Sequence, residues 1–380
     1  MQARSSGILA LAVTSFACSL LLIPAKASAS APNPTKARKG GGLRIGLTAN
    51  AQGGDKYASV TLDKVQPTGA KWLREDFEWS VVEPQDDQWS WSRYDNLLIE
   101  AANRGIHILP VLAVAPPWAA SAWNALPADR SEYAEYTAKV VQRYGPHGRL
   151  WRQQQRQCRK GRPDCRLHHG AAALAPSHFE LWNEPYLSQF SADGVDPARY
   201  ARLVKAAAKA GGRANRRAKY LLAADQGPSG DRLTFIDRMY AAVPHLNSYF
   251  DAVAAHPYTT GHSPDDVNDG WGFPRLANIR AKFVSHGARS KPLWITEIGW
   301  STCPSSPRCV SEQTQADYLA RMFELLRTTY SGYVRAVFVY SRGDLPPTNP
   351  SEPMFWFGLQ RLDDSHKPAY DVFRQAAGAL

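Results

Sequence analysis

The chain has 380 residues, of which 44% are hydrophobic and 21% charged, and a formal net charge of +11 with a pI of about 9.4. Beyond the N-terminal segment, no stretch is long and apolar enough to span a bilayer. No Ser/Thr/Pro linker or change of composition marks an appended binding module, so we expect one large domain.

The N-terminal segment is typical of a cleaved secretory signal. Arg4 supplies a basic start, residues 8–23 are mostly apolar, and overlapping A-x-A sites fill residues 25–31. A transmembrane anchor is the alternative, but the apolar run is short and contains serines. We therefore predict a signal peptide over residues 1–31, a flexible leader over 32–41, and a secreted, extracellular protein.

Eight short apolar runs then alternate with amphipathic stretches, which is the pattern of repeated βα units. Between the runs, apolar residues recur at helical spacing in residues 94–101, 200–207 and 318–326, and Pro368 opens a final helix through Ala377. The eight predicted strands are residues 43–47, 72–74, 106–112, 178–182, 220–224, 252–255, 293–296 and 336–340.

Eight such units predict a single (β/α)8 TIM barrel over residues 42–380. A doubly wound sheet is the competing fold. It is disfavoured because no Gly-rich turn that could hold a nucleotide follows the first strand.

Four cysteines follow the signal segment in two close pairs, Cys158 with Cys165 and Cys303 with Cys309. Export and close spacing favour two local disulfides, each clipping a loop. A zinc site is the alternative, but the spacings are not CxxC and thiolates outside the cell tend to oxidise. The histidines show no metal-binding spacing such as H-E-x-x-H, so we expect no metal and no cofactor.

Positive charge is concentrated in two segments. A solvated surface or adhesion to anionic cell-wall polymers explains them, and an acidic polysaccharide substrate is the alternative. Nucleic-acid binding is disfavoured because the chain is expected to be exported and carries no recognised motif. The first segment holds Arg149, Arg152, Arg156, Arg159, Lys160, Arg162 and Arg166, and the second Arg213, Arg216, Arg217 and Lys219.

Two glutamates each close an apolar run: Glu184 in Phe-Glu-Leu-Trp-Asn-Glu-Pro and Glu297 in Pro-Leu-Trp-Ile-Thr-Glu-Ile-Gly-Trp. At the ends of strands four and seven they would lie at the active mouth of a barrel, and such paired carboxylates cleave glycosidic bonds. Glu297 shares its strand face with Leu293 and Ile295, so we expect its carboxylate to emerge from the barrel core. Asn183 and Glu184 can reach one sugar only if their strand end is bulged or turning.

These two motifs resemble those of clan A retaining glycoside hydrolases, closest to family 39-like enzymes, with family 5 as a neighbour among cellulase-family-type glycosyl hydrolases. The resemblance covers about residues 43–375. It implies that Glu184 is the acid/base, that Glu297 is the nucleophile, and that Asn183 contacts the sugar 2-OH.

Three further residues match positions of these relatives: Arg74 matches an arginine of the clan, and His256 and Tyr258 match a His-x-Tyr of family 5 enzymes at strand six. Arg74 ends the run Trp-Leu-Arg, where clan enzymes carry an arginine that contacts the nucleophile; a surface salt bridge is the alternative. His256 and Tyr258 share one strand face, and the resemblance implies that Tyr258 donates to Glu297 while His256 contacts the sugar or the acid/base. A His and Tyr packed in the core are the alternative.

Aromatic residues in loops after predicted strands could stack on sugars, but most are expected to serve packing. Relatives usually carry a Trp after strand eight, whereas this chain has Tyr340, so Tyr340 or residues 355–357 would take its place. Trp118, Trp300 and Tyr340 are the substrate-binding candidates. The whole set is Trp79, Trp118, Trp123, Tyr186, Trp271, Trp300, Phe355 and Trp356, with Tyr340 at the end of strand eight.

The sequence thus predicts a secreted retaining glycoside hydrolase that cleaves a poly- or oligosaccharide by double displacement, as a monomer without a nucleic-acid partner. The alternatives are a non-catalytic carbohydrate-binding barrel and a transglycosylase that forms the same covalent intermediate. The sugar and the linkage stay open at this level.

Overall fold

The structure is a computed structural model that describes residues 42–49, 54–224, 231–266 and 273–378. The predicted signal peptide and leader therefore lie outside the described residues, as does Trp271.

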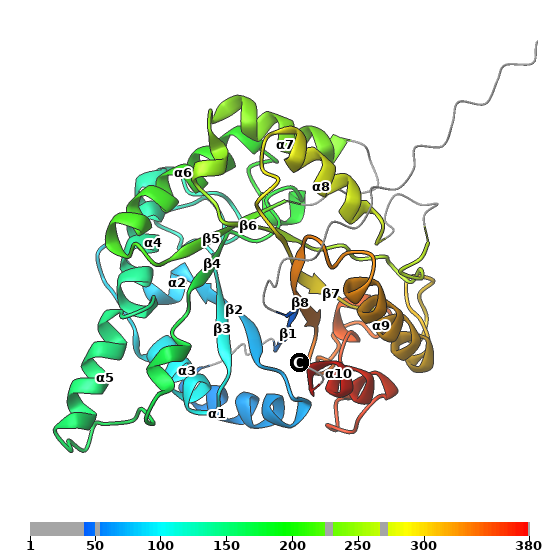
Figure 1. The fold of residues 1–380 in the computed structure, drawn as a ribbon, viewed down its shortest axis with the longest axis horizontal. Helices are drawn as coiled ribbons and strands as arrows, with labels where there is room; N and C mark the ends of the chain where they lie inside the picture. The colour runs from blue at the N-terminus through cyan, green and yellow to red at the C-terminus, as the bar shows by residue number, and fades with distance from the viewer. Residues whose placement is uncertain (1–41, 50–53, 225–230, 267–272, 379–380) are drawn as a thin grey trace, which may run out of the picture. The chain divides into compact units, whose positions relative to one another are not determined.

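Eight parallel strands form a closed barrel (Figure 1). Each strand pairs with the next along the chain, and β8 pairs with β1 to close the sheet. The predicted (β/α)8 fold and its eight strands are confirmed. The strands are β1 Arg44–Thr48, β2 Trp72–Glu78, β3 His107–Ala113, β4 His178–Leu181, β5 Lys219–Ala223, β6 Ala252–Ala255, β7 Leu293–Ile298 and β8 Val334–Tyr340.

Helices surround the barrel on its outer side (Figure 1). The apolar periodicity predicted α3, α6 and α9, and Pro368 predicted the start of α10; each helix forms where it was expected. Side-chain caps fix three starts: Asp129 accepts from the Ser131 N–H, Asp196 from Arg199 N–H and Ser311 from Thr314 N–H. The helices are α1 Gly54–Val65, α2 Trp79–Val82, α3 Ser92–Asn103, α4 Arg130–Tyr144, α5 Arg149–Arg159, α6 Pro197–Ala214, α7 Asp231–Ala242, α8 Arg275–Ser285, α9 Glu312–Arg327 and α10 Pro368–Gly378.

The core has two parts. A large apolar layer lies between the sheet and the helices. Inside the barrel, Trp72, Trp294 and Phe338 form an aromatic plug, in which the Trp72 and Trp294 rings meet edge to face at 5.8 Å. Because the plug occupies the lower part of the barrel interior, a site inside the barrel must lie above it, toward the carboxyl ends of the strands.

The four cysteines pair as predicted. Cys158–Cys165 clips the turn that follows α5, and Cys303–Cys309 clips the loop after β7. None of the helices in the described part of the chain is long and apolar enough to cross a membrane.

Candidate active site

A sharp turn after β4 brings Asn183 and Glu184 into the barrel mouth together. The strand ends at Leu181, one residue earlier than predicted, and Trp182 and Glu184 adopt positive φ angles of 67° and 41°. Non-glycine residues rarely take this left-handed conformation, so the surrounding fold must hold it. The sequence predicted that Asn183 and Glu184 could reach one sugar only if the strand end turned, and the structure has this turn.

Glu297 reaches the mouth by a different route from the one expected. Leu293 and Ile295 pack in the outer layer against the helices, whereas Thr296 bonds to groups inside the barrel. Simple alternation would therefore point Glu297 outward, and the predicted shared inward face of Leu293, Ile295 and Glu297 is wrong. A register shift against β8 between Ile295 and Ile298 interrupts the alternation, and such a bulge re-aims a side chain.

Arg74 joins three strands beneath the mouth. Its Nη1 lies 2.5 Å from Glu297 Oε1, its Nη2 donates to Asn183 Oδ1 at 2.8 Å, and its Nε donates to Glu180 Oε2 at 3.0 Å. The side chain is 3% exposed. Burial opposes its charge, but Glu180 and Glu297 outweigh this effect and raise the pKa of Arg74 well above its usual value. The alternative of a surface salt bridge is excluded.

Glu180 is a buried partner that the sequence analysis missed. It is 0% exposed and accepts two hydrogen bonds from Arg74 and one from the Thr296 hydroxyl. Although burial favours its neutral form, Arg74 and then His256 lower the pKa of Glu180 to about 2. A charged residue inside the apolar run Phe-Glu-Leu was the available signal, because a lone acid on a buried strand needs a cationic partner.

His256 lies between the two candidate catalytic carboxylates. Its Nδ1 is 2.8 Å from Glu184 Oε1 and 3.8 Å from Glu297 Oε2, while its Nε2 is 2.9 Å from Thr296 Oγ1. Burial lowers the pKa of His256, but the charges of Glu297 and Glu184 and the bonds to Glu180 and Glu184 together raise it to about 10. One ring nitrogen reaches both carboxylates, so Glu184 and Glu297 converge on a single point.

Tyr258 completes the surroundings of Glu297. Its hydroxyl donates to Glu297 Oε2 at 2.8 Å, and burial and the charge of Glu297 raise the pKa of Tyr258 well above its usual value. The ring meets Phe357 at 5.6 Å and Tyr340 at 6.5 Å between centroids. Both aromatic groups that were weighed as substitutes for the strand-eight Trp therefore stand beside Tyr258, and both are half-buried.

The aromatic candidates separate into packing and accessible residues. Trp300 is 2% exposed, and its indole N–H donates to Thr259 Oγ1 at 2.7 Å, so it supports the loop after β6 and offers no stacking face. Trp118 is half-buried and donates to the Glu83 carbonyl. Trp123 is 55% exposed and meets Phe190, a neighbour from the loop after β4. Among these, Trp123 offers the most open surface.

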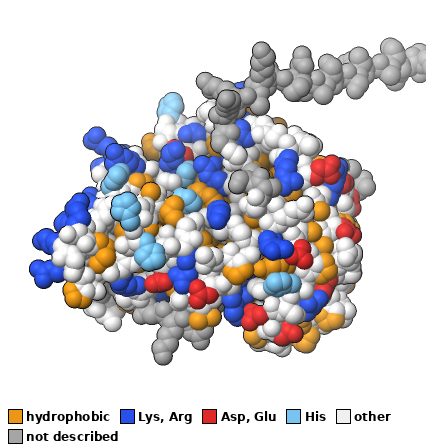
Figure 2. All heavy atoms as spheres, turned by 60° about the horizontal axis from the view of Figure 1, so that its bottom comes forward, with side chains coloured by type: hydrophobic (Ala, Val, Ile, Leu, Met, Phe, Trp, Pro, Cys, Tyr) orange, Lys and Arg blue, Asp and Glu red, His pale blue; other side chains and the backbone are white. Residues whose placement is uncertain are grey.

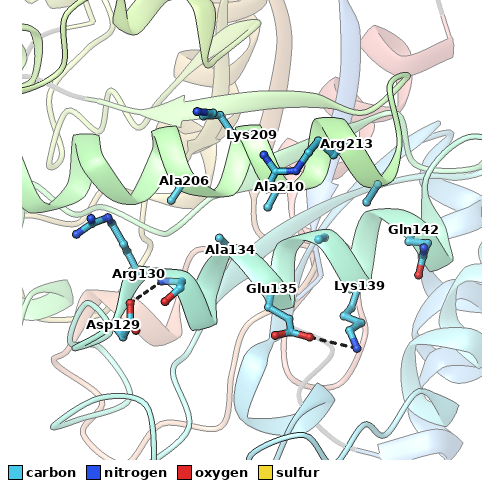
Figure 3. A pocket seen from close by; sticks show the side chains of 13 residues that line it. Asp129, Arg130, Ala134, Glu135, Lys139, Gln142, Ala206, Lys209, Ala210 and Arg213 are labelled. Atoms are coloured by element: carbon cyan, nitrogen blue, oxygen red, sulfur yellow. Dashed lines mark hydrogen bonds and ion pairs between the residues drawn. The ribbon is translucent and has the colours of Figure 1, made fainter.

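Figure 3 shows a separate groove between α4 and α6 on the outside of the barrel, with a volume of about 670 Å³. Alanines form much of its floor, and Glu135 pairs with Lys139 along its edge. None of the residues that converge on Glu184 and Glu297 lines this groove. It is therefore separate from the candidate active site.

Comparison with known proteins gives fold similarity without sequence similarity. No family model matches the chain, and no curated protein matches it. Solved structures do. A family 39 glycoside hydrolase from the gut symbiont Bacteroides cellulosilyticus has a TM-score of 0.63 and 22% identity, covering 88% of this chain and 63% of its own.

A monomeric β-xylosidase from Caulobacter crescentus has a TM-score of 0.59 and 19% identity, covering 87% of this chain and 67% of its own. An exo-β-1,4-mannosidase from an Opitutaceae bacterium has a TM-score of 0.60 and 16% identity, covering 89% of this chain and 59% of its own. The chain thus spans about 63% of the length of the first of these structures. At these identities the matches establish the fold alone, a TIM barrel like that of the family 39 glycoside hydrolase.

Proposed function

We propose that this chain is a secreted, retaining glycoside hydrolase that acts on O-glycosidic bonds of a poly- or oligosaccharide. The observation that carries the proposal is the position of His256 Nδ1, 2.8 Å from Glu184 Oε1 and 3.8 Å from Glu297 Oε2. Glu184 Oε1 and Glu297 Oε2 are therefore no farther apart than the sum of these two distances, which is about the lower limit of the inverting range. Retaining enzymes hold such a pair roughly 5–5.5 Å apart, whereas inverting enzymes need about 6.5–9.5 Å to admit water.

The two carboxylates have different surroundings, which supports different roles. Glu297 accepts hydrogen bonds from Arg74 and Tyr258, which hold its oxygens in place and balance a negative charge. Glu184 faces His256 and the Tyr186 hydroxyl, 3.4 Å away. Glu297, whose two oxygens are both held by donors, thus suits the nucleophile, and Glu184 takes the proton-exchanging role.

In the first step Glu297 attacks the anomeric carbon, the glycosidic C–O bond breaks, and Glu184 gives its proton to the leaving oxygen. In the second step a water gives a proton to Glu184 and attacks the same carbon. The ester bond to Glu297 breaks, and the product keeps its configuration. Asn183, fixed by Arg74, can hydrogen-bond the sugar 2-OH as the transition state forms.

Export is part of the proposal. The two disulfides and the lack of a membrane-spanning helix among the described residues fit a protein that works outside the cell. The similar solved structures include a β-xylosidase and a mannosidase, which supports a carbohydrate substrate.

The test is a screen of the purified protein against aryl glycosides and polysaccharides, alongside Glu184→Gln and Glu297→Ala. Glu135→Gln is the matched control, because Glu135 lies on α4 away from the site. We expect wild type and control to release product and both site variants to lose turnover. Glycan binding without release by the wild type would instead favour a non-catalytic barrel. Transfer products that dominate at high acceptor concentration would favour a transglycosylase.

A further inference from the structure

Asp76 lies on the inner face of β2, two residues beyond Arg74. Trp72 belongs to the aromatic plug and Arg74 contacts Glu297, so alternate residues of β2 point into the barrel. A strand advances about 3.3 Å per residue, which places Asp76 about 6–7 Å closer to the open end than Arg74. Asp76 therefore stands in the wall of the candidate active site.

The Asp76 carboxylate has no protein partner within the described part of the chain, and its side chain is exposed to solvent. Arg74, the nearest cation on its face, already serves Glu180, Glu297 and Asn183. An acceptor that the protein leaves unused in the wall of a cleft is available to a ligand.

The charges around Asp76 are mostly negative. Dense protein around the carboxyl, together with the charges of Glu297, Glu78 and Glu180, outweighs Arg74 and raises the pKa of Asp76 to about 6. The Asp76 side chain is nevertheless open to solvent, and the two observations agree for a group in the wall of an open cleft. Glu78 itself has Arg93 at 3.5 Å, so Arg93 is not free to balance Asp76.

We propose that Asp76 is a specificity-determining residue that accepts hydrogen bonds from a neutral or amino sugar and excludes sugars that carry a carboxylate. The proposal rests on the glycosidase function proposed above. Sugar hydroxyls or an ammonium group satisfy the free acceptor, whereas a uronic acid brings a like charge to a cleft that already holds Glu297. The acidic-substrate alternative raised from the sequence is therefore disfavoured.

The test uses aryl glycosides in matched pairs that differ only at C6, such as glucoside with glucuronide and galactoside with galacturonide, plus the glucosaminide. If only polymers are cleaved, a neutral galactan and polygalacturonate replace them. We expect wild-type kcat/KM to be at least about tenfold higher for the neutral member. Asp76→Asn should reduce that ratio, mainly through KM, while Asp371→Asn, which alters an exposed residue of α10 outside both proposed binding surfaces, should not.

The outcomes separate the two proposals. If the wild type cleaves no glycoside or polysaccharide, the proposed function fails. If it cleaves a uronide as well as its neutral partner, or if Asp76→Asn leaves the ratio unchanged, only the inference about Asp76 fails. Thermal melting of Asp76→Asn checks that a changed ratio does not come from misfolding.

A second inference comes from the first basic segment, whose exposed side chains lie on α5 and on the turn that follows it. We call this surface the basic ridge. In Figure 2, Lys and Arg side chains gather along the left edge, where α5 projects in Figure 1. The buried face of α5 holds Leu150, Trp151 and Gln154, and the Trp151 indole N–H donates to the Tyr144 carbonyl at 2.7 Å. The ridge comprises Arg149, Arg152, Arg156, Arg159, Lys160, Arg162 and Arg166.

Few of the positive charges on the basic ridge have an acidic partner among the described residues. Arg166 has Glu100 at 3.8 Å, the one ion pair of the ridge within the described residues, and Asp164 is the single acid among residues 147–170. The Cys158–Cys165 disulfide fixes the turn that carries the last cations. Beside them lies a pocket of about 490 Å³, lined in part by Arg159, His168 and His169.

The ridge lies at the barrel end opposite the candidate active site. It occupies the connection from α4 to β4, and the second basic segment connects α6 to β5. Both connections enter the amino ends of strands that pair with each other, His178 with Lys219. Carboxyl ends carry the catalytic groups of a barrel, so neither segment lines the cleft.

We propose that the basic ridge docks on a linear acidic polysaccharide and leaves the barrel mouth free. Arginines present paired donors that match carboxylate or sulfate groups. A lipid bilayer is disfavoured, because a membrane-binding helix turns apolar residues outward and α5 turns Leu150 and Trp151 into the protein.

The test measures binding to polygalacturonate at low and high salt, for wild type and for a triple variant, Arg152, Arg156 and Arg159→Gln. The control is Lys71, Arg130 and Arg374→Gln, which removes the same charge elsewhere. We expect at least about tenfold weaker binding for the ridge variant only, with salt-sensitive binding by the wild type. Equal loss in both variants, or binding by the wild type to phosphatidylglycerol vesicles but not to polygalacturonate, would overturn the proposal.

Discussion

The Arg74 guanidinium and the Glu297 carboxylate are 2.5 Å apart, and the same guanidinium also bonds Asn183 and Glu180. One buried cation therefore sets the position of groups from three strands, β2, β4 and β7. Any change of Arg74 should act on both the fold and the proposed chemistry, because this one side chain contacts Glu180, Asn183 and Glu297 together.

Arg74→Lys should lower kcat/KM by about 100-fold or more. Lysine carries a point charge and cannot bond three partners at once, so either Glu180 or Glu297 would lose its cationic partner. Leaving a buried carboxylate without its partner costs about 3–5 kcal/mol of unfolding free energy, which urea unfolding measures. Arg104→Lys is the control, because Arg104 pairs with Asp63 and Glu100 at the surface. This variant should lose less than about 1 kcal/mol of unfolding free energy. Equal effects in both variants contradict the account of Arg74.

Tyr258→Phe removes the hydroxyl that donates to Glu297 Oε2. We expect kcat to fall by about 10- to 100-fold, because the nucleophile loses an orienting hydrogen bond worth roughly 1.5–3 kcal/mol. Steady-state kinetics on any cleaved substrate measures the effect. Tyr318→Phe, which alters a ring that packs on Trp300, should leave kcat unchanged. An unchanged kcat in Tyr258→Phe would remove Tyr258 from the site.

Because the pKa of Glu180 is lowered in the folded protein, the free energy of unfolding should depend on pH in the acidic range. Its folded pKa of about 2 lies below the ordinary 4.5, so its contribution is fully present above pH 4.5 and is lost as the pH falls toward 2. The contribution is on the order of 3 kcal/mol. The melting temperature of the wild type should therefore fall steeply below pH 4.5. In Glu180→Gln the melting temperature should be lower throughout and its acid decline shallower, and an identical acid decline would contradict this assignment.

His256 gives the opposite dependence. Its folded pKa of about 10 lies above the ordinary 6.5, so its contribution is fully present below pH 6.5 and is lost as the pH rises toward 10. Together with Glu180, this places the stability plateau between about pH 4.5 and 6.5. His256→Gln should flatten the alkaline decline of the melting temperature. The control is His286→Gln, which alters a surface pair with Asp237 and should keep that decline.

The barrel and the two carboxylates could be predicted because both depend on local patterns. Apolar runs mark the strands, and a polar residue at the end of a run marks the mouth, as at Glu184. The route by which Glu297 reaches the mouth was not predictable, because a bulge is a relation between β7 and β8 and leaves no trace in alternation. The role of Glu180 was not predicted because its partner, Arg74, lies 106 residues away in the sequence.

Strand length and loop packing account for the remaining differences. The second strand was expected to end at Arg74, yet it continues to Glu78, and Asp76 faces the cleft only because of that extension. Trp300 follows β7 as expected, but sequence position alone does not say whether a loop residue faces ligand or protein. The hydrogen bond from the Trp300 indole to Thr259 shows that this side chain faces the protein.

The central claim is that Glu297 forms a covalent bond to the sugar while Glu184 exchanges the proton, and azide rescue tests it most directly. In Glu297→Ala turnover should fall by about four orders of magnitude. Azide can then enter from the vacated side, and we expect it to restore turnover and to yield a glycosyl azide of inverted configuration. In Glu184→Ala, azide should yield the azide of retained configuration, because Glu297 still attacks first. Inverted sugar from the wild type, or wild-type turnover in either variant, would contradict the account.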